Sequence, residues 1–399
     1  MTSESRAVLP PAGMLSQARA EPPRQAAGQA ASGRAIVHPL VDFLCLGGGS
    51  LLVLPLVMAA PASAVPALVA LMWMLADVLN HPHFAASYQI FYRGYREKAF
   101  GGTLPRPLRR RYLVAGIAVP AVLAGWIAAS FLAGSAYLLG LAGNLMLLLV
   151  GWHYVKQGYG MLMVDAVYRR RFFGRAEKRV LLWNAYACWI LFWLAMNAAV
   201  AERKMWGISY YAVEVPHALL LLAFCAAVAT TTMTLVIFAR RLLGGGGLPV
   251  NGAVAYLTTL YAWALARFNP LTILFVPALH SLQYLTIVWR FEKNRAALRA
   301  AAGAAPQGTG ASDARNGRRQ VLLALARFGA LAAVMGLAGF WWLPRLLGGS
   351  VGYDHEQLGG TAFMFAFWIF INVHHYFIDN VIWRSDNPET AKALFGTGR

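Results

Sequence analysis

The sequence has few cysteines and few charged residues. Its three cysteines, Cys45, Cys188 and Cys225, lie in apolar segments without CxxC spacing. We therefore expect core thiols, and neither a disulfide framework nor an iron–sulfur centre. Charged residues make up 13% of the 399 residues against 59% hydrophobic residues, and the mean hydropathy is +0.52. A soluble protein of this length needs more polar surface, so the composition predicts a membrane protein.

The N-terminal segment lacks the apolar stretch of a cleavable signal peptide. Residues 1–35 are rich in Ala, Pro, Gln and Arg, which predicts a disordered cytoplasmic segment. Residues 296–316 have the composition of a flexible cytoplasmic loop, and residues 384–399 are expected to form a cytoplasmic tail. The transmembrane domain is then expected over residues 36–383.

Long apolar stretches recur through that domain, each of about 18 residues or more and thus long enough to cross about 30 Å of hydrocarbon. They predict an all-α, polytopic transmembrane helix bundle. The ten expected spans are 40–60, 64–92, 112–133, 135–168, 180–200, 216–239, 251–267, 271–289, 321–344 and 361–383.

Acidic residues are scarce, and the basic residues are unevenly distributed. The chain has 35 Lys and Arg against 16 Asp and Glu, a net charge of +19. If the N-terminus is cytoplasmic, 29 of the 35 basic residues fall in inward segments and four in outward loops. This is the asymmetry of the positive-inside rule, and it predicts cytoplasmic N- and C-termini in a bacterial-type inner (plasma) membrane. The charge is a topology signal, so we expect no nucleic-acid partner.

Six of the nine histidines lie deep in four spans that run from outside to inside: His81, His83, His153, His280, His374 and His375. Three of these spans repeat one pattern, a histidine followed ten residues later by an arginine with an aromatic residue before it: His83/Arg93, His280/Arg290 and His374/Arg384. The aromatic–arginine pair is typical of the cytoplasmic interface. Ten residues at a rise of 1.5 Å place each histidine about 15 Å above it, near the bilayer midplane. His153 precedes Arg169 by sixteen residues and would lie higher unless its helix tilts or extends beyond the membrane.

Helical spacing gives these histidines candidate partners. Asp77 precedes His81 by four residues and Asp379 follows His375 by four, so each pair can share a helix face. A carboxylate or amide commonly accepts the second N–H of a metal-bound imidazole, and the aspartates are alternatively ligands themselves. Two more side chains have the same offset from a histidine: Gln157 from His153 and Tyr284 from His280.

A proline separates two of the histidines. Positions two apart in a regular helix point about 200° away from each other, so His81 and His83 would face different ways. A kink at Pro82 could turn both inward.

Polar groups within a membrane are costly and usually functional, which favours a shared metal or heme site. A proton or ion pathway and a structural hydrogen-bond network are the alternatives. Imidazole with a few carboxylates suits iron, copper or zinc and argues against calcium or magnesium. Lipids, isoprenoids or quinones can reach a midplane site sideways. We therefore expect a metal-dependent oxidoreductase that uses dioxygen to hydroxylate, desaturate or cleave a lipophilic substrate, with an electron-donor protein as a second partner beside the bilayer.

In type, the histidine set resembles that of the histidine-rich integral-membrane di-iron enzymes, which include fatty-acid desaturases, hydroxylases and bacterial carotene-cleaving oxygenases. The resemblance covers the histidine-bearing helix halves. Those desaturases have HxxxH and HxxHH boxes, where this chain has HPH, a single His153, HSLQY and NVHHYFID; only His374–His375 matches the end of an HxxHH box. With that chemistry, we expect iron as the cofactor, as two ions.

A second resemblance suggests heme and copper instead. The set HxH, H, HxxxY and HH looks like the histidine inventory of heme-copper oxidases, although its order along the chain is circularly shifted and ten spans replace that family's usual minimum of twelve.

A non-enzyme alternative is a metal-ion or proton transporter that uses the midplane histidines. The spans contain few carboxylates for a cation path, which counts against it.

Overall fold

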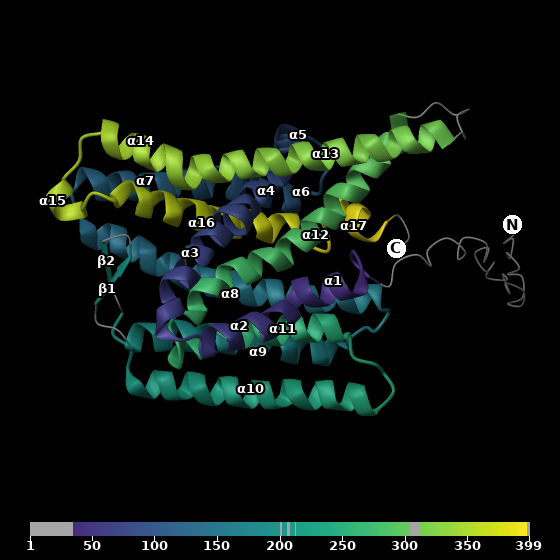
Figure 1. The fold of residues 1–399 in the computed structure, drawn as a ribbon, viewed down its shortest axis with the longest axis horizontal. Coiled ribbons are helices and arrows are strands. Elements are labelled where there is room, and N and C mark those ends of the chain that lie inside the picture. The colour runs from purple at the N-terminus through teal and green to yellow at the C-terminus, as the bar shows by residue number, and fades with distance from the viewer. Residues whose placement is uncertain (1–34, 200–201, 206–207, 212, 304–310, 397–399) are drawn as a thin grey trace, which may run out of the picture. The chain divides into compact units, whose positions relative to one another are not determined.

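Helices make up nearly all of the chain that this computed structural model describes, which is residues 35–199, 202–205, 208–211, 213–303 and 311–396 (Figure 1). The first half contains α1 (Pro39–Phe43), α2 (Gly49–Ala59), α3 (Val65–Leu75), α4 (His81–Tyr92), α5 (Tyr95–Phe100), α6 (Arg106–Leu113), α7 (Val119–Leu132), α8 (Ala136–Tyr168) and α9 (Arg175–Ala198). The second half contains α10 (His217–Leu243), α11 (Val250–Tyr261), α12 (Thr272–Gly303), α13 (Ala311–Leu337), α14 (Leu343–Ser350), α15 (His355–Leu358), α16 (Ala362–Ile382) and α17 (Pro388–Phe395).

Short elements of other kinds join or interrupt these helices. Between α9 and α10, strands β1 (Glu202–Met205) and β2 (Ile208–Tyr211) form an antiparallel hairpin in which Glu202 pairs with Tyr211. Two 3₁₀ turns are η3 (Ala62–Ala64) and η6 (Ala262–Arg267). Within the described residues, four turns are π-helical: η2 (Leu44–Gly48), η4 (Ala76–Asn80), η5 (Val114–Ala118) and η7 (Ala338–Trp342).

Nine helical stretches of the described chain are long and apolar enough to cross a membrane, so the expected multi-pass helical bundle is confirmed at that level. They are Pro39–Ala59, Ala62–Tyr92, Arg106–Leu132, Ala136–Tyr168, Arg175–Ala198, His217–Leu243, Thr272–Ala302, Arg315–Ser350 and Ala362–Ile382. The spans in α12 and α16 are the most buried, at 61% of their most apolar window, whereas those in α10 and α13–α14 are buried to only 17% and 11%. The core therefore lies around α12 and α16.

The remaining expected span, 251–267, is not a continuous α-helix. Its α-helical part, α11, has 12 residues, or about 18 Å at 1.5 Å per residue, and continues as the 3₁₀ turn η6. The segment still extends alongside α1 and α2 from end to end. At its start the amide oxygen of Asn251 accepts from Phe43 N of α1 at 3.3 Å, and just beyond its end Asn269 Nδ2 donates to Val57 O at 3.3 Å.

Proline accounts for three of the four π-helical turns. η4, η5 and η7 each end two residues before a proline: Pro82, Pro120 and Pro344. Because proline has no N–H and its ring clashes with the preceding turn, the helix cannot keep its regular hydrogen bonds there. These turns release backbone carbonyls that buried side chains can then bind.

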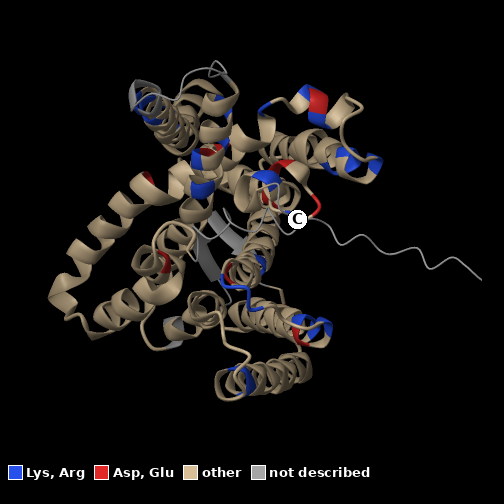
Figure 2. Cartoon of the chain, turned by 90° about the vertical axis from the view of Figure 1, so that its right-hand side faces the viewer, with Lys and Arg blue, Asp and Glu red and all other residues tan. Residues whose placement is uncertain are grey.

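The expected N-terminal segment, cytoplasmic loop and C-terminal tail lie partly outside the described residues. Of the N-terminal segment, residues 1–34 are outside them. Of the loop expected at 296–316, the residues up to Gly303 continue α12 and those from Ala311 begin α13. The tail at 384–399 contains α17, which packs on the bundle: Asn294 Nδ2 donates to Ala393 O and Tyr168 Oη to Leu394 O. Figure 2 looks onto the right-hand end of Figure 1 and shows Lys and Arg at the ends of several helices there. We call this end the basic face; it includes Arg384, which lies between α16 and α17.

Candidate metal centre

Four helices bring four histidines and one aspartate together in the interior. The members of this histidine–aspartate centre are His83 from α4, His153 from α8, His280 from α12, and His375 and Asp379 from α16. Each residue is buried, with at most 6% of its surface exposed. All four helices belong to the spans in which the sequence pattern located deep histidines.

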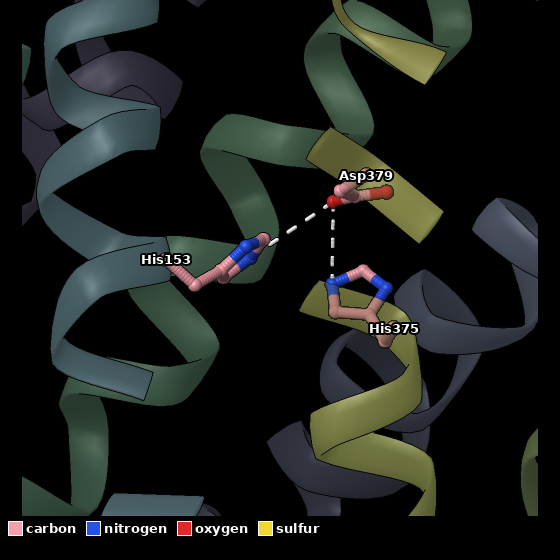
Figure 3. Close-up of side chains that lie close together, drawn as sticks. All are labelled: His153, His375 and Asp379. Carbon is pink, nitrogen blue, oxygen red and sulfur yellow. Dashed lines mark ion pairs between the residues drawn. The ribbon is translucent and has the colours of Figure 1, made fainter. Parts of the chain in front are cut away.

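Three members of the centre, His153, His375 and Asp379, have the spacing of ligands to one ion, because their ligand atoms all lie within 4.8 Å of one another. The Nε2 atoms of His153 and His280 are 3.1 Å apart. Asp379 Oδ2 lies 3.3 Å from Nε2 of His375 and 3.9 Å from Nε2 of His153 (Figure 3). Two atoms that each lie about 2.1 Å from one ion, at about 90–135° to each other, are separated by about 3.0–3.9 Å.

The hydrogen bonds of His375 leave its Nε2 without a proton. Ser87 has one hydroxyl hydrogen, which it donates to Phe84 O at 2.6 Å. The contact of 2.7 Å between Ser87 Oγ and His375 Nδ1 therefore has Nδ1–H as the donor. The bare Nε2 then faces Asp379 Oδ2, and neither atom has a hydrogen-bond partner. Two buried acceptors in contact need a cation or an additional proton between them.

His83 is fixed in the same tautomer by a different group. Its Nδ1 lies 2.5 Å from Asn80 O, and a carbonyl oxygen can only accept, so Nδ1 is the donor. Asn80 is the last residue of the π-helical turn η4, two residues before Pro82. The buried Nε2 has no hydrogen-bond partner, and the imidazole ring lies 4.8 Å from that of His375.

The remaining members of the centre are positioned by tyrosines. Tyr284 Oη donates to Asp379 Oδ1 at 2.9 Å, which leaves Oδ2 to face the histidines. His280 stacks on Tyr154 with ring centroids 3.8 Å apart. The imidazole of His153 stacks on Tyr376 in the same way, with ring centroids 4.6 Å apart.

His81 lies outside the centre. Its Nδ1 is 3.0 Å from Asp77 Oδ1, the pairing that the i+4 spacing predicts, and its ring stacks on Phe340 at 4.1 Å. α4 is a regular helix from His81 onward, so Pro82 does not turn His81 and His83 to the same side.

His374 also lies outside the centre, and both of its ring nitrogens have partners. Nε2 lies 3.0 Å from Ala115 O in the π-helical turn η5, which requires a donating N–H. Nδ1 is then the acceptor for Tyr88 Oη at 2.9 Å. No lone pair is left for a metal, so the neighbouring His375 is the better candidate.

Two of the predicted hydrogen-bond partners have other roles, and two serines were missed. Gln157 Nε2 donates to the backbone oxygen of His280 at 2.9 Å, and Tyr284 binds Asp379, so neither contacts the imidazole four residues before it. Ser87 binds Nδ1 of His375, and Ser281 Oγ lies 3.0 Å from Nδ1 of His83. In the sequence, Ser87 and Ser281 are recognisable only as hydroxyl residues within the HPHFAAS and HS segments. Such a residue does not by itself identify a histidine partner on another helix.

A narrow cleft reaches the centre beside His280. It offers about 20 Å³ of free space and is lined by Ser50, Tyr154, Thr258, Thr259, Ala262, Val276, Leu279, His280 and Gln283. A cavity needs about 10–15 Å³ of such space to hold one water molecule. The cleft therefore suits water or a diatomic molecule better than a lipid.

Comparisons with protein-family models, with curated proteins and with solved structures gave no match for this chain.

Proposed function

We propose that this protein is an integral-membrane, metal-dependent oxidoreductase that uses iron and dioxygen to hydroxylate, desaturate or cleave a lipophilic substrate. The observation that carries the proposal is a set of buried lone pairs: His83 Nε2, His375 Nε2 and Asp379 Oδ2 have no hydrogen-bond partners. The Nε2 atoms of His153 and His280 are 3.1 Å apart, so at most one proton fits between them. A site so rich in acceptors fits a cation.

The donor set favours one transition-metal ion. Four imidazoles and one carboxylate suit iron, copper or zinc rather than magnesium or calcium. His153, His375 and Asp379 each offer a ligand atom within 4.8 Å of the other two, which suits a single ion, so we propose one iron where the sequence suggested two. The close contact of His153 and His280 leaves no room for a porphyrin between them, which counts against heme.

When bound, iron would supply the activation of dioxygen that attack on C–H bonds or double bonds requires. The chain's own residues prepare the site. Ser87 and the Asn80 carbonyl hold His375 and His83 with Nε2 inward, and Tyr284 orients the carboxylate of Asp379. Burial of these side chains excludes bulk water, and the cleft beside His280 gives a small co-substrate a path inward.

Adjacent histidines provide a matched test of the metal site. In detergent-purified protein we expect about one iron per chain and no Soret band. His375→Gln should lose most of that iron, whereas His374→Gln should keep it, because the parent His374 side chain has no free lone pair. His83→Gln and His81→Gln form a second pair with the same expected contrast. Equal iron content in both members of each pair would overturn the proposal.

Functional outcomes separate the alternatives. An oxidoreductase should consume dioxygen when reconstituted with isoprenoid or fatty-acyl lipids and an electron donor, and His375→Gln should abolish this. Uptake of iron or protons into liposomes without dioxygen would identify a transporter instead. A Soret band would replace the iron site with heme.

A further inference from the structure

A chain of aromatic side chains joins the histidine–aspartate centre to the basic face. Tyr284 on α12 contacts the centre: its ring lies 5.3 Å from that of His83, and its hydroxyl donates to Asp379 Oδ1 at 2.9 Å. On its other side, the Tyr284 ring lies 5.6 Å from the indole of Trp383 at an angle of 84°. Trp383 directly follows α16, is only partly buried, and precedes Arg384 on the basic face. Two rings thus connect the buried centre to this end of the molecule.

We propose that Tyr284 and Trp383 form a one-electron relay through which a surplus oxidising equivalent leaves the centre. The relay rests on the proposed function, because dioxygen chemistry at the centre supplies the oxidant. Tyr284 gives up one electron to the site, and its phenolic proton moves along the existing hydrogen bond to Asp379. The tyrosyl radical takes one electron from Trp383 and recovers the proton. A one-electron reductant at the basic face, a thiolate or a reduced flavin, then reduces Trp383.

The proton acceptor distinguishes this route from a second aromatic chain in the same core. Trp263 lies 5.5 Å from Tyr154, which stacks on His280 at 3.8 Å. The second chain reaches the centre by stacking of Tyr154 on the face of the His280 ring. Tyr284, in contrast, donates a hydrogen bond to a carboxylate, that of Asp379. A buried phenol that loses an electron without its proton becomes an uncompensated charge in a low-dielectric interior, which is costly. The relay therefore runs through Tyr284, and Trp263 gives a matched control.

Flash oxidation of metal-free protein tests the relay independently of iron. Ser385 is exposed two residues after Trp383, and Ser385→Cys provides an attachment point for a ruthenium photo-oxidant. The exposed native cysteine is removed by Cys225→Ser, and a labelled sample without the Ser385→Cys change gives the background. After chelation of all metal, a flash with an external quencher generates the oxidised label, and electron paramagnetic resonance records the radical that forms.

The flash runs the same electron step in reverse: oxidised Trp383 should take one electron from Tyr284, whose phenolic proton moves to Asp379. The labelled protein should therefore give a tyrosyl radical that Tyr284→Phe removes. Trp383→Phe preserves an aromatic ring but is much harder to oxidise, and should lower the radical yield at least about tenfold, equivalent to about 1.4 kcal/mol in barrier. Trp263→Phe should leave the yield unchanged. An equal yield in Trp383→Phe, or the same signal in Tyr284→Phe, would overturn the relay. Loss of the iron contrast between His375→Gln and His374→Gln with an intact radical signal would overturn the proposed function alone.

Discussion

Removing the hydroxyl of Ser87 tests whether the hydrogen bonds around the centre prepare it for a metal. Ser87 Oγ accepts the Nδ1–H of His375 at 2.7 Å, and both residues have no exposed surface. In Ser87→Ala no water can replace the lost oxygen. Without metal, His375 can move its proton to Nε2 and donate to Asp379. With metal bound, Nε2 is occupied and the Nδ1–H stays unpaired, so the penalty falls on the metal-bound state.

The size of the effect follows from that asymmetry. A buried polar group left without its partner costs about 1–3 kcal/mol. Since 1.4 kcal/mol corresponds to a factor of ten in a dissociation constant, ferrous iron should bind about 10–100-fold more weakly. The folded state without metal should keep nearly its original stability, because tautomer exchange relieves the loss.

The assay is competition between the protein and a chromophoric chelator for ferrous iron, with thermal unfolding of the metal-free form measured alongside. Ser130→Ala is the control: Ser130 is equally buried and donates to Trp126 O at 2.9 Å on α7, away from the centre. The reasoning is refuted if Ser87→Ala and Ser130→Ala bind iron with the same affinity, or if Ser87→Ala weakens folding but not binding.

Three further substitutions probe the bundle and the centre. In Gly252→Val the new Cβ would lie 2.8 Å from Leu162 Cα, so α11 must move from α8, and the thermal midpoint should fall with a destabilisation of about 1–3 kcal/mol. Asn184→Leu removes a fully buried amide that binds two tyrosines and two threonines; unfolding should be easier by about 1–3 kcal/mol or more, with unchanged iron content per folded chain. Tyr284→Phe removes the hydrogen bond to Asp379 Oδ1, so chelator competition should show iron binding weakened about tenfold.

The apolar runs predicted the bundle well because the length and hydropathy of a span are local properties. The segment 251–267 departs from a continuous helix, since its α-helical part is short and its length is completed by a 3₁₀ turn. The hydropathy of such a segment does not distinguish a continuous α-helix from a short α-helix followed by a 3₁₀ turn. Interactions with other helices, such as those of Asn251 with Phe43 N and of Asn269 with Val57 O, place it in the bundle.

The depth of the histidines was predictable, but the direction of each side chain was not. The histidine–arginine spacing placed His83, His280 and His374 at one level, yet the centre contains His375 instead of His374. A helix turns about 100° per residue, so neighbours at one depth face different helices. Which face is inward depends on packing between spans and on carbonyls released in π-helical turns, such as Ala115 O, which binds His374.

The hydrogen bonds at the edge of the centre also bear on the choice between a ligand set and a structural network. In a network each imidazole would stabilise the cluster most by donating Nε2–H into it. Instead, Ser87 and Asn80 O bind the Nδ1–H groups of His375 and His83, which leaves the Nε2 atoms of both rings bare, that of His375 at 3.3 Å from Asp379 Oδ2. Without a cation this arrangement leaves several buried acceptors unpaired. A metal that binds the folded chain offsets that penalty and stabilises the fold by mass action, so the outward hydrogen bonds favour a ligand set.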